Sequence, residues 1–419
     1  MERTEAEDTD VIVSPSELVE AEETAEISVE ELALRDVEPA AEDEPADDDE
    51  TTVDFELPGS GQPGSGQPAS GLPASGQPAS GLPLPSGEAP ASDPLAEAMT
   101  VMESLRARVR SQVIGRDSVI DLVLVALLSD GHVLLEDFPG SGKTTLAKAL
   151  GASIVDDLAD DDIASFRRIQ FTPDLLPSDV TGVSVFDPVS NRFHFRHGPI
   201  FAHVVLADEI NRTSPKVQSA MLEAMAEKQV TVDNQTYPLD ELFFVIATQN
   251  PHDMAGTYPL PVAQLDRFLF KIRMVHIDRQ AELEVLNTHR ERRDIRREDL
   301  PRVTRSQVLA ARHAIDGGVA IDAQVKECLV DIAQNIRNDE RVLLGSSTRS
   351  LVLMLPALQA LAALRGRDYV TSDDIQLLVP RVFGHRVDLA PGVTELDRVL
   401  ADAMEGPIES LARSTLRRR

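Results

Sequence analysis

The stretch Asp137-Phe138-Pro139-Gly140-Ser141-Gly142-Lys143-Thr144 decides the fold of this chain. The apolar run 132–136 precedes it and the segment 145–150 has helical character, so the stretch is predicted to link a strand to a helix. Such a glycine-rich loop turns backbone N–H groups toward phosphates, while a lysine reaches the outer phosphates and the next hydroxyl can hold Mg²⁺. The usual pattern starts with glycine where this chain has Asp137, a departure that concerns only the entry turn of the loop.

These residues define a candidate binding site for ATP. We assign the phosphate contacts to Pro139, Gly140, Ser141, Gly142, Lys143, Thr144 and Thr145. Thr144 is also the first candidate ligand of Mg²⁺. An ordinary Gly/Ser turn with a surface lysine is the alternative, and the strand–loop–helix setting disfavours it.

The charge of the chain is unevenly distributed. The 419 residues carry a net charge of −31, and residues 1–56 hold 23 Asp and Glu against two Arg, so −21 lies there and −10 elsewhere. A basic face, which nucleic-acid binding requires, is not evident. No basic start followed by an apolar core and no uncharged apolar run of about 18 residues is seen, which predicts a cytoplasmic protein without membrane insertion. The single cysteine, Cys328, lies in an apolar helical pattern and is predicted to be a buried hydrophobic residue.

Residues 1–96 are predicted to be a disordered tail. The first 56 are rich in Glu, Asp and Ala, which favours a solvated chain. A Ser-Gly-x-Pro repeat over 60–83 follows and is typical of a linker, because glycine keeps it flexible and proline blocks helix formation. Apolar spots at 12–13, 18–19 and 27–29 leave open a partner-docking segment in place of a plain solubilising tail.

The middle of the chain alternates predicted strands and helices. Helices are expected from Asp93-Pro94 onward and over 117–128 and 217–228, and buried strands over 166–171, 204–207 and 243–247. Hairpins are expected over 183–195 and around Asp233-Asn234. This order predicts an α/β fold, a mostly parallel three-layer αβα domain over residues 97–277.

The remainder has helical spacing only. Segments 280–288, 305–315, 323–336, 350–364 and 372–378 predict a helical lid domain over 278–390, followed by a C-terminal tail over 391–419.

A pair of acids ends one predicted strand. Asp208 and Glu209 follow four apolar residues, 65 positions after Lys143. In phosphate-loop enzymes, the first acid holds the metal and the second polarises the attacking water. A strand that simply ends in two solvated acids is the alternative.

Three further residues complete a candidate hydrolytic set. Asn250 ends the next apolar strand, where an amide can contact the γ-phosphate and the water. Arg267, in Leu265-Asp266-Arg267-Phe268, could act on a neighbouring subunit's phosphates, although an Asp–Arg surface pair is the alternative. Arg349 opens a predicted helix of the lid and could point toward the same nucleotide.

These elements, in this order, resemble the AAA+ ATPases, and the segments between them resemble the MoxR family. The blocks that carry the resemblance are 168–179, 198–201, 208–212, 265–268 and 366–370, within a similarity that covers roughly residues 98–390. The resemblance implies an αβα core with a hairpin inserted in its second helix, matched here by 183–195, a helical lid and assembly into hexameric rings.

The family's roles carry over to matching residues. Lys143 and Thr144 would contact phosphate and Mg²⁺, and Asp208 and Glu209 would be metal holder and base. Asn250 would be the first sensor, Arg267 the arginine finger and Arg349 the second sensor. Arg212 also matches an arginine of its block and competes with Arg267 for the role in trans.

The resemblance further implies a chaperone-like ATPase that remodels, assembles or activates partner proteins, often alongside a von Willebrand A domain protein. The motor subunit of a chelatase-like metal-insertion machine is the second interpretation, and dependence on a porphyrin substrate would distinguish it. A nucleic-acid translocase is disfavoured by the missing basic face. A nucleotide-dependent scaffold with little turnover is the alternative from another class, and Glu209 argues against it.

Overall fold

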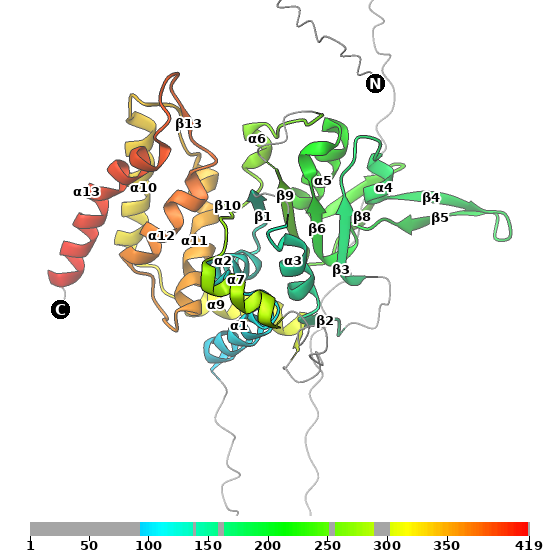
Figure 1. Ribbon diagram of the computed structural model, residues 1–419, viewed down its shortest axis with the longest axis horizontal. Helices are drawn as coiled ribbons and strands as arrows, with labels where there is room; N and C mark the ends of the chain where they lie inside the picture. The colour runs from blue at the N-terminus through cyan, green and yellow to red at the C-terminus, as the bar shows by residue number, and fades with distance from the viewer. Residues whose placement is uncertain (1–92, 137–139, 158–162, 251–255, 289–301, 418–419) are drawn as a thin grey trace, which may run out of the picture. The chain divides into compact units, whose positions relative to one another are not determined.

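The strands of the computed structural model form a central parallel sheet flanked by helices. The model describes residues 93–136, 140–157, 163–250, 256–288 and 302–417. The main sheet has the order β10-β1-β9-β6-β3, and its neighbouring strands pair in parallel (Figure 1). Its strands are β1 (Val133–Glu136), β3 (Ala164–Gln170), β6 (Ala202–Asp208), β9 (Phe244–Gln249) and β10 (Phe270–Arg273). The predicted αβα core is therefore confirmed.

The inner strands of the sheet are buried on both faces, as their apolar runs require, whereas the edge strand β3 carries the exposed Arg167 and Arg168. All seven residues of β6 are buried. Val204 and Leu206 contribute to one hydrophobic cluster, together with residues of α1 (Pro94–Arg110), α2 (Asp117–Leu128) and α3 (Lys143–Gly151). The intervening residues Val205 and Ala207 contribute to a second cluster with α5 (Pro215–Glu227). Alternate side chains of each strand thus face opposite helical layers.

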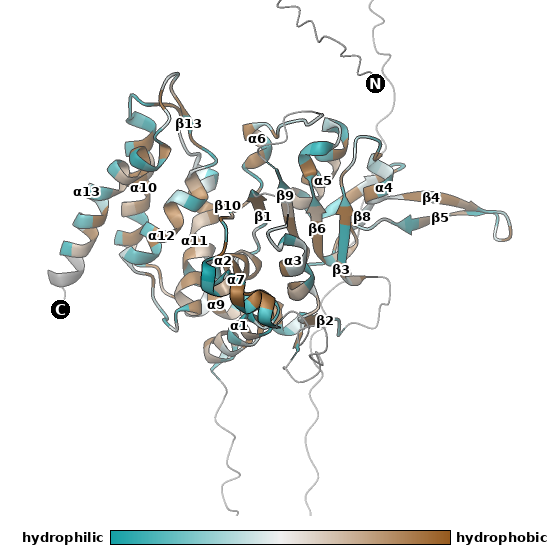
Figure 2. Ribbon diagram, viewed as in Figure 1, coloured by the Kyte–Doolittle hydropathy of each residue, from teal (hydrophilic) through white to brown (hydrophobic). Residues whose placement is uncertain are grey.

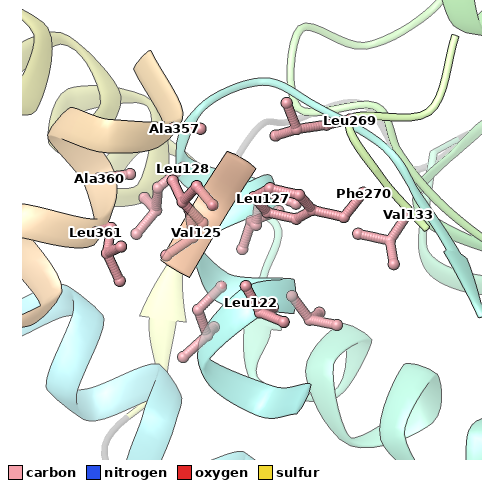
Figure 3. Packing of buried hydrophobic residues seen from close by; sticks show 14 of the residues in the cluster. Leu122, Val125, Leu127, Leu128, Val133, Leu269, Phe270, Ala357, Ala360 and Leu361 are labelled. Atoms are coloured by element: carbon pink, nitrogen blue, oxygen red, sulfur yellow. The ribbon is translucent and has the colours of Figure 1, made fainter. Parts of the chain in front are cut away.

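Helix α2 joins the sheet to the lid helices. Nine of its twelve residues are buried, so it is apolar on every side, which is the pattern of a helix enclosed by protein. Figure 3 shows Leu122, Val125, Leu127 and Leu128 between α11 and the strands β1 and β10, and the labelled neighbours are Val133, Leu269, Phe270, Ala357, Ala360 and Leu361. One hydrophobic cluster therefore extends from the αβα core into the lid helices.

The lid is helical, as predicted. Its longer elements are α9 (Arg305–Gly318), α10 (Ala323–Asn338), α11 (Thr348–Leu364), α12 (Ser372–Phe383) and α13 (Leu396–Arg417), and α7 (Arg279–Thr288) precedes them. Short pieces of structure complete the description: β2 (Ile154–Val155), α4 (Pro177–Thr181), η1 (Ile210–Arg212), α6 (Val262–Leu265), β11 (Val303–Thr304), β12 (Val342–Leu344) and β13 (Asp388–Leu389).

Two sequence-based boundaries need correction. Helix α1 starts at Pro94, capped by Asp93, whose carboxylate accepts a hydrogen bond from the Leu95 N–H at 3.1 Å, so the core starts before residue 97. The segment 391–419 is not a plain tail, because α13 occupies 22 of its residues and buries Leu400 and Leu411. Proline at position 407 inside this helix obscures its pattern in the sequence. The acidic segment and the repeat lie outside the described residues.

Two antiparallel hairpins extend the core. The hairpin β4 (Gly182–Asp187) and β5 (Arg192–His197) points away from the sheet, and Figure 2 shows β4 as its more hydrophobic strand. The second hairpin, β7 (Gln229–Val232) and β8 (Gln235–Pro238), turns through Asp233 and Asn234, which both have positive φ. Phe195 stacks on Tyr237 with 3.9 Å between ring centroids, so the two hairpins are packed together.

No helix of the described ranges is long and apolar enough to cross a membrane. Cys328 is buried in α10, and burial raises the pKa of its thiol to about 11, as expected for a packed rather than a reactive cysteine.

A buried histidine makes the stability of this fold depend on pH. His132 lies at the entry to β1, where Nε2 contacts the Met225 carbonyl at 3.1 Å and Nδ1 accepts a hydrogen bond from the Val245 N–H at 3.1 Å. Nδ1 is therefore unprotonated. Burial lowers the pKa of His132 from 6.5 to about 4.

We expect acid to destabilise the fold partly through this histidine. Between pH 6.5 and 4 the imidazole of His132 is protonated in the unfolded chain but not in the folded chain. The free energy of unfolding therefore falls by about 1.4 kcal/mol for each pH unit of acidification. His132→Gln should flatten the dependence of the unfolding free energy on pH in this window, measured by urea denaturation. His313→Gln, at an exposed position, is the control, and an equal change in both variants would contradict this origin.

Candidate functional site

The polar residues of the site gather at one edge of the sheet. Because the five strands are parallel, their carboxyl ends share this edge, which is where ligands bind in open α/β sheets. The phosphate loop leaves β1 there, Asp208 ends β6, and Asn250 follows β9. Gln170 ends β3, pairing in register with Asp208.

The phosphate loop leads into α3 through two glycines with left-handed backbones. Gly140 has φ +89° and Gly142 has φ +95°, values that a residue with a Cβ adopts only with strain. Among the described residues, chain neighbours aside, no atom lies within 4 Å of a Cβ built at either position, so open space adjoins both glycines. Lys143 is the first residue of α3, and Thr144 follows it in the first turn at an exposed position. Pro139 lies outside the described residues.

A cavity of about 310 Å³ adjoins the loop. Gly140, Ser141, Gly142 and Thr145 line one part of it. The remaining described lining residues come from the end of α1, the turn before α2 and the region of α7: Gln112, Val113, Ile114, Arg116, Val275, His276, Ile277, Glu282 and Val285. A largely apolar recess next to a phosphate loop suits the base of a nucleotide.

Arg116 fixes the wall of this cavity and was missed by the sequence analysis. Its guanidinium donates to the Val275 carbonyl and, at 3.4 Å, to the Ser141 carbonyl of the loop. Gly115 beside it has φ +70°, and a Cβ there would lie 2.6 Å from Ala281. The signal in the sequence was the Gly-Arg pair just before a strong apolar helix.

Both oxygens of the Asp208 carboxylate have partners. The Thr248 hydroxyl donates to Oδ1 at 2.7 Å, and the Arg168 guanidinium donates to Oδ2 at 3.0 Å from Nε and 2.6 Å from Nη2. Asp208 is only 7% exposed, so these contacts fix the direction of the carboxylate. Thr248 and Arg168 come from the strands on either side of β6.

Glu209 follows in a strained backbone conformation. Its φ is +59°, which is uncommon for a residue with a side chain and turns the carboxylate away from the line of β6. The Gln170 amide donates to Glu209 Oε2 at 2.9 Å, and Arg212 Nε lies 3.4 Å from the same oxygen. Glu209 is therefore oriented by groups of β3 and η1.

Two arginines of the lid, Arg349 and Arg386, lie close to Asp266. Arg349 Nε is 3.7 Å from Asp266 Oδ2, and the buried Arg386 donates to Asp266 Oδ1 at 2.6 Å. Arg267 follows Asp266 and donates to the Leu222 carbonyl of α5. Arg349 therefore contacts Asp266, the residue before Arg267, and its role as the second sensor stays a prediction.

The oxygen atoms at the sheet edge suit a hard divalent cation. Mg²⁺ prefers carboxylate, hydroxyl and water ligands, and Thr144 and Asp208 supply the first two. The fixed Asp208 carboxylate and the open glycine loop therefore fit Mg²⁺ and the phosphates of ATP.

Comparisons with known proteins agree with this site. The chain matches the family described as "ATPase family associated with various cellular activities (AAA)" over residues 132–270, and the AAA lid domain over 334–403. A solved structure of a proposed ATPase from Cytophaga hutchinsonii is similar with a TM-score of 0.65 and 32% identity, covering 74% of this chain and 96% of that one.

Two similar proteins indicate the family to which the chain belongs within this class. YeaC of Bacillus subtilis, an uncharacterised protein, is 46% identical over 306 residues, which are 73% of this chain and 92% of YeaC. Chaperone MoxR1 of Mycobacterium tuberculosis is 36% identical over 325 residues, 73% of this chain and 81% of the relative. A phosphate loop in an αβα core with this lid defines an AAA+ ATPase. Within that class, the chain belongs to the MoxR family.

Loss of the loop lysine should weaken nucleotide binding. Lys143→Ala removes the cation that we assign to the outer phosphates, at the first residue of α3, and we expect the Kd for ATP to rise at least about tenfold by calorimetry. Lys148→Ala, at an exposed position in the last turn of the same helix, is the control and should bind ATP as the wild type does. Equal affinity of the two variants would contradict the assignment.

Proposed function

We propose that this protein hydrolyses Mg²⁺-bound ATP in a ring of identical subunits, a hexamer by family resemblance, and thereby remodels, assembles or activates partner proteins. The observation that carries the proposal is the meeting of Asp208 and Glu209 with the phosphate loop at one sheet edge. A scaffold that only binds nucleotide needs the loop, whereas hydrolysis also needs a carboxylate to accept the proton of water.

Each polar residue then has a distinct task. Lys143 and the loop N–H groups hold the phosphates, and Thr144 and Asp208 hold Mg²⁺, which neutralises charge on the phosphate oxygens. Glu209 accepts a proton from the attacking water, and Asn250 orients that water against the γ-phosphate. Gln170 supports this role of Glu209, because its hydrogen bond directs the carboxylate.

The arginines support a site shared between subunits. Arg212 lies 3.4 Å from Glu209 of its own chain, which favours Arg267 over Arg212 as the finger in trans. Arg349 lies 3.7 Å from Asp266, the residue before Arg267, and keeps the proposed role of second sensor. A positive charge that the neighbouring subunit's Arg267 places on the departing phosphate would make turnover depend on assembly.

The long hairpin supports a role in contacting partner proteins. Phe193 is 71% exposed and Val189 is 94% exposed, and Phe186 packs on Phe193 with 5.2 Å between ring centroids. Exposed apolar groups at the end of a projecting hairpin are typical of a protein-binding surface. One relative is named a chaperone, and we propose a partner protein with a von Willebrand A domain.

Two alternative functions can be distinguished from this one by experiment. A chelatase-like motor would require a porphyrin substrate for full ATPase stimulation. A scaffold would bind ATP with turnover at background level, and the orientation of Glu209 by Gln170 favours an enzyme.

Replacing the proposed base should separate binding from turnover. Glu209→Gln keeps the size of the side chain but cannot accept a proton, so we expect ATP affinity within about twofold of wild type and a kcat at least about 100-fold lower. Phosphate release and calorimetry measure the two quantities. Substantial remaining turnover would exclude Glu209 as the base.

Mixing two inactive variants should restore part of the activity. Arg267→Ala subunits keep Glu209, and Glu209→Gln subunits keep Arg267, so mixed rings contain some complete sites. We expect each variant alone to be nearly inactive and the mixture to regain measurable phosphate release. Absence of any recovery, with mixed assemblies verified by native mass spectrometry, would contradict a finger in trans.

A further inference from the structure

Thr248, which the sequence analysis did not single out, lies between the two acids of the site. It is the fifth residue of β9, next to β6 in the sheet, and its side chain is fully buried. Its register neighbour on β1 is Leu135, one residue before the end of that strand. Strand alternation places Thr248 and Asp208 on the same face of the sheet as α3, the helix that follows the phosphate loop.

The Thr248 hydroxyl acts both as a hydrogen-bond donor and as a hydrogen-bond acceptor between the two acids. It donates to Asp208 Oδ1 at 2.7 Å and accepts from the Glu209 N–H at 2.8 Å. One oxygen atom therefore holds Oδ1 of the Asp208 carboxylate, whose Oδ2 is held by Arg168, and also supports the backbone that carries Glu209.

The second of these bonds supports a strained residue. Glu209 has φ +59°, a conformation that costs a residue with a side chain free energy. Without an acceptor, the Glu209 N–H would be an unsatisfied donor at a half-buried position. The hydroxyl of Thr248 thus stabilises the turn that directs Glu209 toward the proposed nucleotide.

We propose that Thr248 is a positioning residue for the metal site. Its hydroxyl holds Asp208 in the direction that receives Mg²⁺ and couples this direction to the conformation of Glu209. Thr248 itself does not touch ATP or metal in this assignment. The inference rests on the proposed Mg²⁺-dependent ATP hydrolysis. It assigns the Thr248 hydroxyl a part in setting the affinity of the site for Mg²⁺.

The decisive variant is Thr248→Val, which keeps the shape of the side chain and removes the hydroxyl. We expect the Mg²⁺ concentration for half-maximal ATPase to rise about 10- to 100-fold, the usual effect of losing a partner behind a metal ligand. ADP affinity in EDTA, measured by calorimetry, should stay within about twofold, while the gain in ADP affinity on adding Mg²⁺ should fall. Thr248→Ser, which restores the hydroxyl, should recover the wild-type Mg²⁺ dependence to within about threefold.

A matched control comes from Thr213, another fully buried threonine, whose hydroxyl has no hydrogen-bond partner among the described residues. Thr213→Val should leave the Mg²⁺ dependence unchanged. If Thr248→Val does not fold, Thr248→Cys carries the same test, because a thiol donates and accepts only weakly.

The outcomes are distinguishable. A wild-type Mg²⁺ dependence in Thr248→Val, or a defect that Thr248→Ser does not repair, would overturn the inference. Equal loss of ADP affinity with and without Mg²⁺ would also overturn it, since that result indicates general disruption. If the wild-type protein itself gained no ADP affinity on adding Mg²⁺, the proposed function would fail first.

Discussion

Burial of the inner strands of the parallel sheet on both faces is the constraint on which the rest of this structure depends. Strands such as β6 expose no side chain, so each face needs its own helical layer, and the sheet contributes to a separate hydrophobic cluster on each face. Most polar residues of the inner strands therefore lie at the strand ends, whereas the edge strand β3 carries Arg167 and Arg168 in its middle. Parallel pairing then brings those ends to a single edge, and the site arises there from separate parts of the chain.

The lid is tied to this core by packing and by a few ion pairs. Helix α2 contacts both the sheet and α11, so the hydrophobic cluster is continuous across them. Arg305 at the start of α9 donates to Asp240 at 2.9 Å, and Arg312 donates to Asp130 at 2.7 Å. Within the lid, the buried Asp374 accepts hydrogen bonds from Arg365 and Arg367, which gives the segment 366–370 a structural role. The lid and the core are therefore joined by apolar packing and by charged contacts.

The polar contacts of the sheet edge form a chain across its strands. Lys271 of β10 lies 2.9 Å from Glu136 of β1, which accepts a hydrogen bond from Gln249 of β9 at 2.5 Å. Beyond them, Thr248, Asp208 and Arg168 continue the chain to β3. Low dielectric strengthens such contacts, and each group restricts its neighbour. Carboxylates held in fixed directions are what this edge supplies.

The sequence by itself determined the elements with strong local signals. The phosphate loop, the strands that lead to Asp208 and Asn250, the hairpin turn at Asp233 and Asn234, and most helices follow from apolar periodicity and from glycine and asparagine chemistry. The acids Asp208 and Glu209 were found because they end an apolar strand, a pattern that is local. The helix α13 was missed, since Pro407 and a mixed surface weaken its periodicity.

Only the tertiary structure decided which side chains support those acids. Thr248, Arg168 and Gln170 lie about 40 residues from their partners, on neighbouring strands that are separated along the chain by helices and hairpins. The same holds for Arg349, whose place beside Asp266 depends on how α11 packs against the core. Hydrogen bonds between strands depend on register and pairing, which residue types alone do not specify. Local sequence patterns therefore identified the candidate reacting groups, whereas long-range strand pairing determined which residues orient them.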